Sequence, residues 1–174
     1  TRILYSAVSR SSPVECLHAA MDMDSRWAQI QLSSSDSPGC TYQFLKKLPE
    51  IFPVRLLGFI YIGEFDFTGL SLPSKSLPLN SLDSFCRSDD LLLLNEQKKY
   101  DKTRKLLISA FQSTDMSNFE LPMDLCCLKF EKLSHVYNQE IRLKSIKNHT
   151  PAEYLKKRFM YYPGSFVKRP KIIL

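Results

Sequence analysis

Apolar and polar residues alternate in two stretches of the chain, and this period of two is typical of half-buried β-strands. The stretches are residues 2–9 (RILYSAVS) and residues 26–32 (RWAQIQL). A third stretch, residues 54–62 (VRLLGFIYI), is almost continuously apolar. Such a run favours a central strand that is covered on both faces of a sheet. Gly58 inside it indicates a bulge or a close packing contact.

Two helices are predicted from their first residues. Residues 12–15 (SPVE) and residues 150–153 (TPAE) each place a hydroxyl side chain at the cap and a proline at the first helical position. Each also has a glutamate that can reach back to the backbone of the cap residue, which completes a capping box. We therefore predict one helix from residue 13 to about residue 23 and another from residue 151 to about residue 162.

Weaker patterns complete the list of elements. We expect helices over 42–51 and from residue 89 or 90 to 111, and strands over 124–130 and 166–174. Residues 136–146 fit either a strand or a helix. This order predicts an α+β or α/β fold, with a single mixed β-sheet, helices packed on it, and a basic C-terminal helix and tail. At 174 residues the chain is expected to be a single domain over 1–174.

Residues 69–82 (GLSLPSKSLPLNSL) contain the triplet Ser-Leu-Pro twice. Because prolines at this spacing oppose a helix and favour an extended path, we predict an irregular loop, either a flexible connection or a docking peptide. The apolar end of the chain (KIIL) is also expected to pair with the sheet or with a partner. The predicted docking residues for a protein partner are Leu72, Leu77, Leu79, Ile172, Ile173 and Leu174.

Composition narrows the class of protein. With 44% hydrophobic and 24% charged residues, the chain has the composition of a globular protein and not of a disordered one. No apolar run reaches the roughly 18 residues of a membrane span, so none is expected. Five cysteines without a paired spacing indicate a reducing compartment, the cytoplasm or the nucleus. Since residue 1 is Thr, we expect a fragment or a processed form.

Positive charge is concentrated at the C-terminal end of the sequence. Residues 142–174 contain nine Lys and Arg residues and a single acid, Glu153, whereas the whole chain has a net charge of +6. Residues 1–141 are therefore slightly acidic. A basic field of this kind attracts nucleic acid, an anionic membrane or an acidic protein.

Aromatic residues are interspersed with these basic ones, as in proteins that contact phosphates through Lys and Arg and stack bases on rings. Helical geometry places Leu155, Phe159 and Tyr162 on one stripe that should face the core, which leaves Tyr154, Tyr161 and Phe166 for stacking. The predicted nucleic-acid-binding residues are Lys156, Lys157, Arg158, Lys168, Arg169, Lys171 and Tyr161.

The sequence contains no organised catalytic or metal-binding motif. No Cys-x-x-Cys pair is present, and no glycine-rich phosphate loop or nucleophile elbow, so we expect no metal and no cofactor. If the chain were an enzyme, we would look first at Glu64 and Asp66 after the central strand, and at Cys86 as a nucleophile.

These observations lead to two hypotheses about function. The first is a non-catalytic protein–protein interaction domain, a scaffold or adaptor in an intracellular complex whose partners are other protein subunits, and not an enzyme. The alternative is a nucleic-acid-associated protein that binds DNA or RNA through the basic aromatic C-terminal segment. The sequence indicates neither the identity of the partner nor the oligomeric state.

Overall fold

The computed structural model describes residues 2–9, 16–33, 38–61, 77–95 and 123–167 of the chain. In these ranges five strands form one sheet in the order β3-β2-β1-β4-β5. Strand β2 pairs antiparallel with both β1 and β3, whereas β1, β4 and β5 run parallel to one another. The predicted α+β class with a single mixed sheet is confirmed. The strands are β1 (Arg2–Ser9), β2 (Cys16–Asp22), β3 (Ala28–Ser33), β4 (Gly58–Tyr61) and β5 (Leu92–Asn95).

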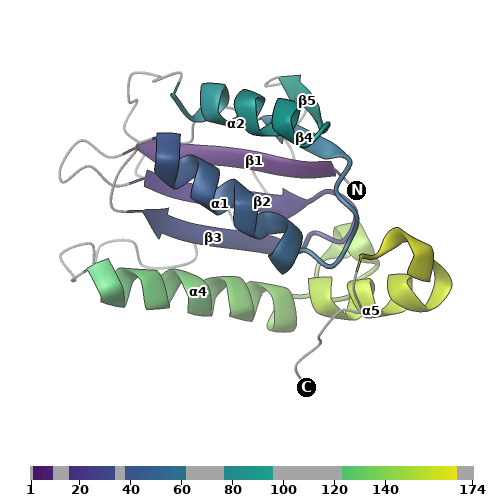
Figure 1. Cartoon of the computed structure of the whole chain (residues 1–174). Coiled ribbons are helices and arrows are strands. Elements are labelled where there is room, and N and C mark those ends of the chain that lie inside the picture. The colour runs from purple at the N-terminus through teal and green to yellow at the C-terminus, as the bar shows by residue number, and fades with distance from the viewer. Residues whose placement is uncertain (1, 10–15, 34–37, 62–76, 96–122, 168–174) are drawn as a thin grey trace.

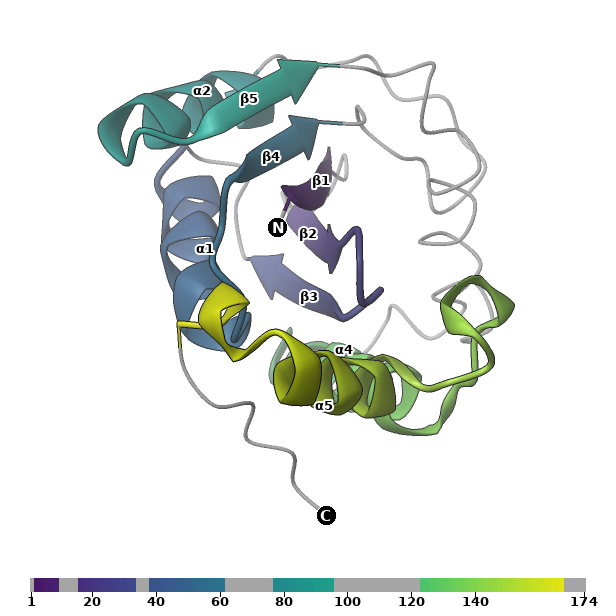
Figure 2. The ribbon, with the colours of Figure 1, turned by 90° about the vertical axis from the view of Figure 1, so that its right-hand side faces the viewer.

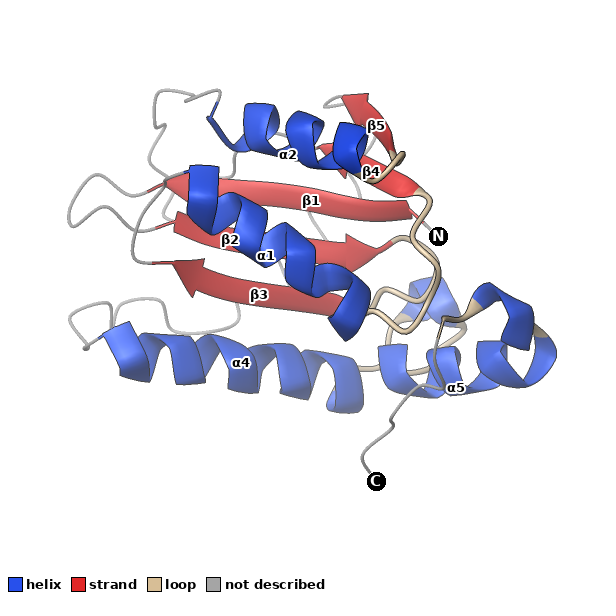
Figure 3. Ribbon diagram, in the orientation of Figure 1, coloured by secondary structure: helices blue, strands red, loops and turns tan. Residues whose placement is uncertain are grey.

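Helices lie on one face of the sheet, along one edge and at one end (Figures 1 and 3). Viewed end-on, α1 (Pro38–Ile51) and α2 (Leu77–Ser88) cover one face, and α4 (Met123–Glu140) lies beside β3 (Figure 2). Helix α5 (Pro151–Tyr161) lies at the end of the sheet where β1 begins. Two short 3-10 turns, η2 (Lys144–Ile146) and η3 (Pro163–Ser165), flank α5. None of the helices described is long and apolar enough to cross a membrane.

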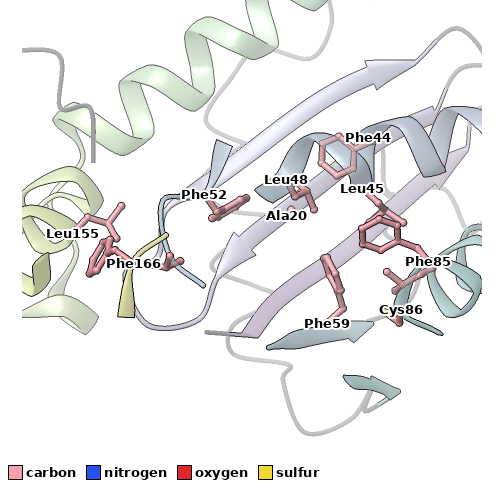
Figure 4. Close-up of a cluster of buried hydrophobic side chains, with 12 residues drawn as sticks. Ala20, Phe44, Leu45, Leu48, Phe52, Phe59, Phe85, Cys86, Leu155 and Phe166 are labelled. Atoms are coloured by element: carbon pink, nitrogen blue, oxygen red, sulfur yellow. The ribbon is translucent and has the colours of Figure 1, made fainter. Parts of the chain in front are cut away.

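The core forms where α1 and α2 pack on the sheet (Figure 4). Helix α1 contributes Phe44, Leu45 and Leu48, which follow the predicted inward stripe and are fully buried. They meet Phe59 of β4 and Phe85 of α2, and the rings of Phe59 and Phe85 pack edge to face. Burying large aromatic and aliphatic side chains in one layer supplies most of the driving force for folding.

Gly58 begins β4 because β5 approaches it closely. A Cβ atom built at this position would collide with the carbonyl oxygen of Leu92, the residue that pairs with Gly58 in β5. The close packing contact predicted for this glycine is therefore present. Strand β4 itself is shorter than predicted, since Val54 makes only an isolated bridge to Phe166.

Three predicted elements are wrong, because tertiary pairing decided them. The helix expected to run to residue 23 is strand β2 where the structure describes it, and Ala19, Ala20 and Met21 are buried there. The start of the helix expected from residue 89 or 90 is instead β5, parallel to β4. The strand expected over 124–130 belongs to α4, which also contains the first part of the undecided segment 136–146.

The predicted irregular loop is partly wrong as well. Residues 77–82 belong to α2, and the remaining residues of the predicted loop lie outside the described ranges. Pro78 falls at the second position of this helix, where a missing backbone N–H is tolerated. The second Ser-Leu-Pro triplet therefore leads into a helix.

Polar side chains attach α4 to the edge strand β3 of the sheet. Asn138 Oδ1 accepts a hydrogen bond from the backbone N–H of Ala28 at 2.9 Å, and Asn138 Nδ2 donates to the carbonyl oxygen of Ala28 at 2.7 Å. Ser134 Oγ accepts from the N–H of Ile30 at 3.1 Å. These bonds satisfy backbone groups of β3 that no strand of the described sheet reaches, and they hold the end of α4 from which the chain continues to α5.

Candidate nucleic-acid interface

Helix α5 begins at the predicted capping box. Thr150 Oγ1 accepts from the backbone N–H of Glu153 at 3.2 Å, and Glu153 Oε2 accepts from the N–H of Thr150 at 3.0 Å. The Arg142 guanidinium donates to both carboxylate oxygens of Glu153, at 2.7 and 3.1 Å. The hydrogen bond from the Thr150 backbone, together with Arg142, holds the pKa of Glu153 below its usual value. The only acid of residues 142–174 is thus committed to starting the helix.

One face of α5 is fixed against the body of the protein. Pro151, Ala152 and Leu155 are buried, and Phe159 packs edge to face on Phe166 with ring centroids 5.2 Å apart. Phe166 in turn bridges to Val54, just before β4. Since this face is held by apolar contacts at several points, the opposite face has a defined orientation toward solvent.

A buried carboxylate, that of Asp22, shapes the turn that carries the ion-pair partner of Arg158 in α5. Asp22, at the end of β2, accepts from the backbone N–H of Ser25 at 3.1 Å and from its hydroxyl at 2.5 Å. These bonds shape the turn between β2 and β3, which carries Asp24. Asp24 Oδ2 then accepts from Arg158 Nη1 of α5 at 2.9 Å. The turn therefore fixes the direction of the Arg158 side chain.

The turn before α5 places two more side chains beside the helix. An antiparallel bridge between Leu143 and His149 closes the turn, and Lys147 and Asn148 both have left-handed backbone angles, with φ of 57° and 59°. His149 Nδ1 lies 3.1 Å from the carbonyl oxygen of Ile146. It also lies 3.0 Å from the carbonyl oxygen of Lys147. Because both neighbours are acceptors, Nδ1 carries the proton, and Nε2 is the ring nitrogen left for a ligand.

These elements enclose a surface hollow of about 270 Å³. Four of its residues recur at helical spacing along one stripe of α5, and the turn and the C-cap supply the others. The lining residues are Lys147, His149, Tyr154, Lys157, Arg158, Tyr161 and Tyr162. Among the residues that the structure describes, the lining therefore combines cations, tyrosine rings and one imidazole, without a carboxylate.

The predicted nucleic-acid-binding residues divide into three groups. Lys157, Arg158 and Tyr161 line the hollow, whereas Lys156 is exposed on α5 outside the lining. Lys168, Arg169 and Lys171 lie outside the described residues. Only part of the predicted set is thus brought together at one place.

Two aromatic assignments made from the sequence are wrong. Phe166, expected to be available for stacking, is buried against Phe159. Tyr162, expected on the core-facing stripe, is exposed and lines the hollow. The reason is that α5 ends at Tyr161, and Tyr162 leaves the helical path with φ of −136° and ψ of 59°. Lys147 and His149 were not among the predicted site residues, because their position beside α5 depends on the fold of the turn.

Among the described residues, the structure does not bring the other predicted site residues together. Leu77 and Leu79 fall in α2, and the docking residues Leu72, Ile172, Ile173 and Leu174 lie outside the described ranges, as do Glu64 and Asp66. Cys86 is buried in the core, and burial, with Asp83 and Asp89 nearby, raises the pKa of its thiol to about 11. A thiol with this pKa stays protonated at neutral pH and is a poor nucleophile. Within the described ranges no three His, Cys, Asp or Glu residues are grouped so that they could hold a metal ion.

Comparison with solved structures identifies the fold. The chain is similar to the catalytic core domain of HTLV-2 integrase in complex with magnesium, in its trimeric form. The TM-score is 0.58 at 13% identity, over 88% of this chain and 94% of that one. The dimeric form of the same domain gives a TM-score of 0.53 at 14% identity, over 86% of this chain and 91% of that one. No protein-family model and no curated protein matches the sequence.

This likeness corrects the first functional hypothesis. We predicted a non-catalytic interaction scaffold because the sequence contains no organised catalytic motif. That prediction is wrong as the main hypothesis, since the two solved structures reported above are catalytic core domains of an integrase. At these identities the likeness shows the fold alone, and the prediction that this chain is not an enzyme stays a prediction.

Proposed function

We propose that this chain is a nucleic-acid-associated protein that contacts DNA or RNA through the outer face of α5 and the turn before it. The observation that carries this is the lining of the hollow, where Lys147 and Lys157 stand among exposed tyrosine rings. Proteins that bind nucleic acid combine lysine or arginine for phosphates with aromatic rings for bases. The likeness in fold to the catalytic core domain of HTLV-2 integrase supports the same proposal.

The unpaired positive charges in α5 and in the turn before it favour an anionic ligand. Arg142 is held by Glu153 and Arg158 by Asp24, so their charges are already matched. Among the described residues, Lys147, Lys156 and Lys157 form no ion pair and are exposed. Their positive field is therefore available to phosphates, and it would draw a nucleic acid toward this end of the sheet.

The role proposed is one of binding. The described residues of the hollow offer cations, rings and an imidazole, but none of them is an acid that could hold Mg²⁺ or work with a base. Nucleic acid is accordingly the first partner to test, and protein subunits remain a prediction. Of the two predicted compartments, a nucleic-acid-associated role favours the nucleus.

Salt dependence of binding tests this function. Titration of a labelled duplex and a labelled single strand at increasing salt should show a steep, linear fall of log affinity with log salt concentration. Replacing Lys147 and Lys157 by Gln should weaken binding to every sequence and reduce the salt slope by about one for each lysine that contacts a phosphate.

Matched controls come from exposed lysines elsewhere. Lys47 in α1 and Lys132 in α4 are exposed and do not line the hollow, so the double change Lys47→Gln and Lys132→Gln removes the same charge. This control should keep most of the wild-type slope. Equal losses in both double variants would show that only net charge matters. Absence of any salt-dependent binding by the unchanged protein would refute the proposed function.

A further inference from the structure

Two tyrosine rings at the C-terminal end of α5 are unusually open to solvent. The exposed fractions of Tyr161 and Tyr162 are 69% and 68%, and both residues line the hollow. Neither makes a ring contact with another residue in the part of the chain that the structure describes. Exposed aromatic faces beside lysines are the surface on which unstacked bases pack.

The size of the hollow limits what can enter it. At about 270 Å³ it is slightly smaller than typical pockets for drug-sized ligands, which begin near 300 Å³. One planar base has room in such a space. A base within a duplex cannot stack on the rings, because its faces are covered by the neighbouring base pairs. A base can reach the rings only if it is free to leave the stack, as in a single strand, a loop or an end.

Polar groups of the lining suit the rest of a nucleotide. Lys157, one turn before Tyr161 on the same stripe, and Lys147 from the turn are exposed cations that can meet the phosphates on either side of a bound base. His149 Nε2 is an acceptor while the ring is neutral, since Nδ1 donates to backbone carbonyls. It can accept a hydrogen bond from a donor on the edge of a base.

On the basis of the nucleic-acid association proposed above, we propose that this hollow binds one unpaired nucleotide of a single strand. The base stacks on Tyr161 or Tyr162, and the flanking phosphates contact Lys147 and Lys157. The chain therefore prefers single-stranded over double-stranded nucleic acid, and part of this preference comes from stacking and is insensitive to salt.

Three labelled probes of equal length test this: an oligothymidylate, the same strand without bases, and a blunt duplex. Fluorescence anisotropy should give the tightest binding to the oligothymidylate and weaker binding to the abasic strand, whose phosphates are the same. Changing both Tyr161 and Tyr162 to Ala should weaken binding of the oligothymidylate by roughly tenfold or more and leave the abasic strand almost unaffected.

Neighbouring residues on the same helix provide the controls. Met160 is as exposed as Tyr161, at 69%, but does not line the hollow, so Met160→Ala should bind like the unchanged protein. Lys157→Glu should lose more affinity than Lys156→Glu, although both make the same change of charge on adjacent residues. Far-ultraviolet circular dichroism confirms that each variant is folded.

The outcomes separate this inference from the proposed function. If all three probes bind equally well with a steep salt slope, nucleic-acid association stands and the nucleotide site is overturned. The site is also overturned if the double tyrosine variant binds the oligothymidylate like the unchanged protein. If no probe binds at all, both ideas fail together.

Discussion

The α4–β3 junction and the outer face of α5 use polar side chains in opposite ways. At the junction, Asn138 and Ser134 are buried, and each bonds a backbone group of β3. On α5, Lys157 and Tyr161 face solvent and line a hollow. Buried polar groups must be matched within the protein, whereas exposed ones remain available to a ligand. The first region should therefore determine stability and the second should determine binding.

The largest effect is expected from Asn138→Leu. The change leaves the N–H and the carbonyl of Ala28 without their partners at a buried edge, so the free energy of unfolding should fall by about 2–5 kcal/mol. Chemical denaturation measures this directly. Gln139→Leu, at the next and less buried position of α4, is the control and should change stability by no more than about 0.5 kcal/mol. Similar losses in both variants would contradict the assigned role of Asn138.

The sheet should also respond to pH, through His18 of β2. The ring is buried and stacks on Phe44 with centroids 5.1 Å apart, and burial lowers its pKa to about 4. Between pH 6.5 and 4 the unfolded chain binds a proton at this residue that the folded chain does not. Stability should therefore decrease as the pH falls below 6.5, by about 1.4 kcal/mol per pH unit.

Denaturation at several pH values, with His18→Phe as the comparison, isolates this effect. Phe keeps an aromatic ring beside Phe44 but cannot be protonated, so the variant should lose the slope between pH 6.5 and 5. Carboxylates contribute at lower pH in both proteins, and the difference between the two curves removes their contribution. Identical slopes would show that His18 is not the titrating group.

The smallest effect should come from Asp24→Asn, in the turn between β2 and β3 that contacts α5. Breaking the exposed ion pair with Arg158 should reduce stability by less than about 1 kcal/mol. It also releases the Arg158 guanidinium into the lining of the hollow, so affinity for nucleic acid should rise by a few-fold. Melting curves and anisotropy titrations measure the two opposite changes.

Asp83→Asn is a matched control for this experiment. Asp83 pairs with Arg87 at 2.9 Å on α2, also at the surface, and its replacement makes the same change of charge. Only Asp24→Asn should improve binding. If both variants gain equally, the improvement comes from net charge and not from Arg158.

Several elements were predicted correctly from signals that lie within a few neighbouring residues, although the capping pattern of residues 12–15 wrongly predicted a helix where β2 lies. The alternation of residues 2–9 matches β1, and the stripe of Phe44, Leu45 and Leu48 marks the buried face of α1. The capping box placed the start of α5 at the right residue. In each case the information is local, because a period or a cap acts within one or two turns of the chain.

Elements that depend on distant partners were predicted poorly. Strand β2 lies between β1 and β3 and is buried on both faces, so it lacks the alternation that would distinguish it from a helix. The helical pattern of α4 becomes clear only over its full 18 residues, whereas its first residues alone resemble a strand. Short apolar runs are ambiguous in this way.

The candidate site shows the same division. The sequence alone determined that positive charge and aromatic rings are concentrated near the C-terminus, and that a capped helix carries many of them. Only the tertiary structure decided which of them face solvent together: it buried Phe166, turned Tyr162 outward and brought Lys147 and His149 beside α5. Composition and caps are properties of neighbouring residues, whereas a binding surface depends on which faces the rest of the chain has already covered.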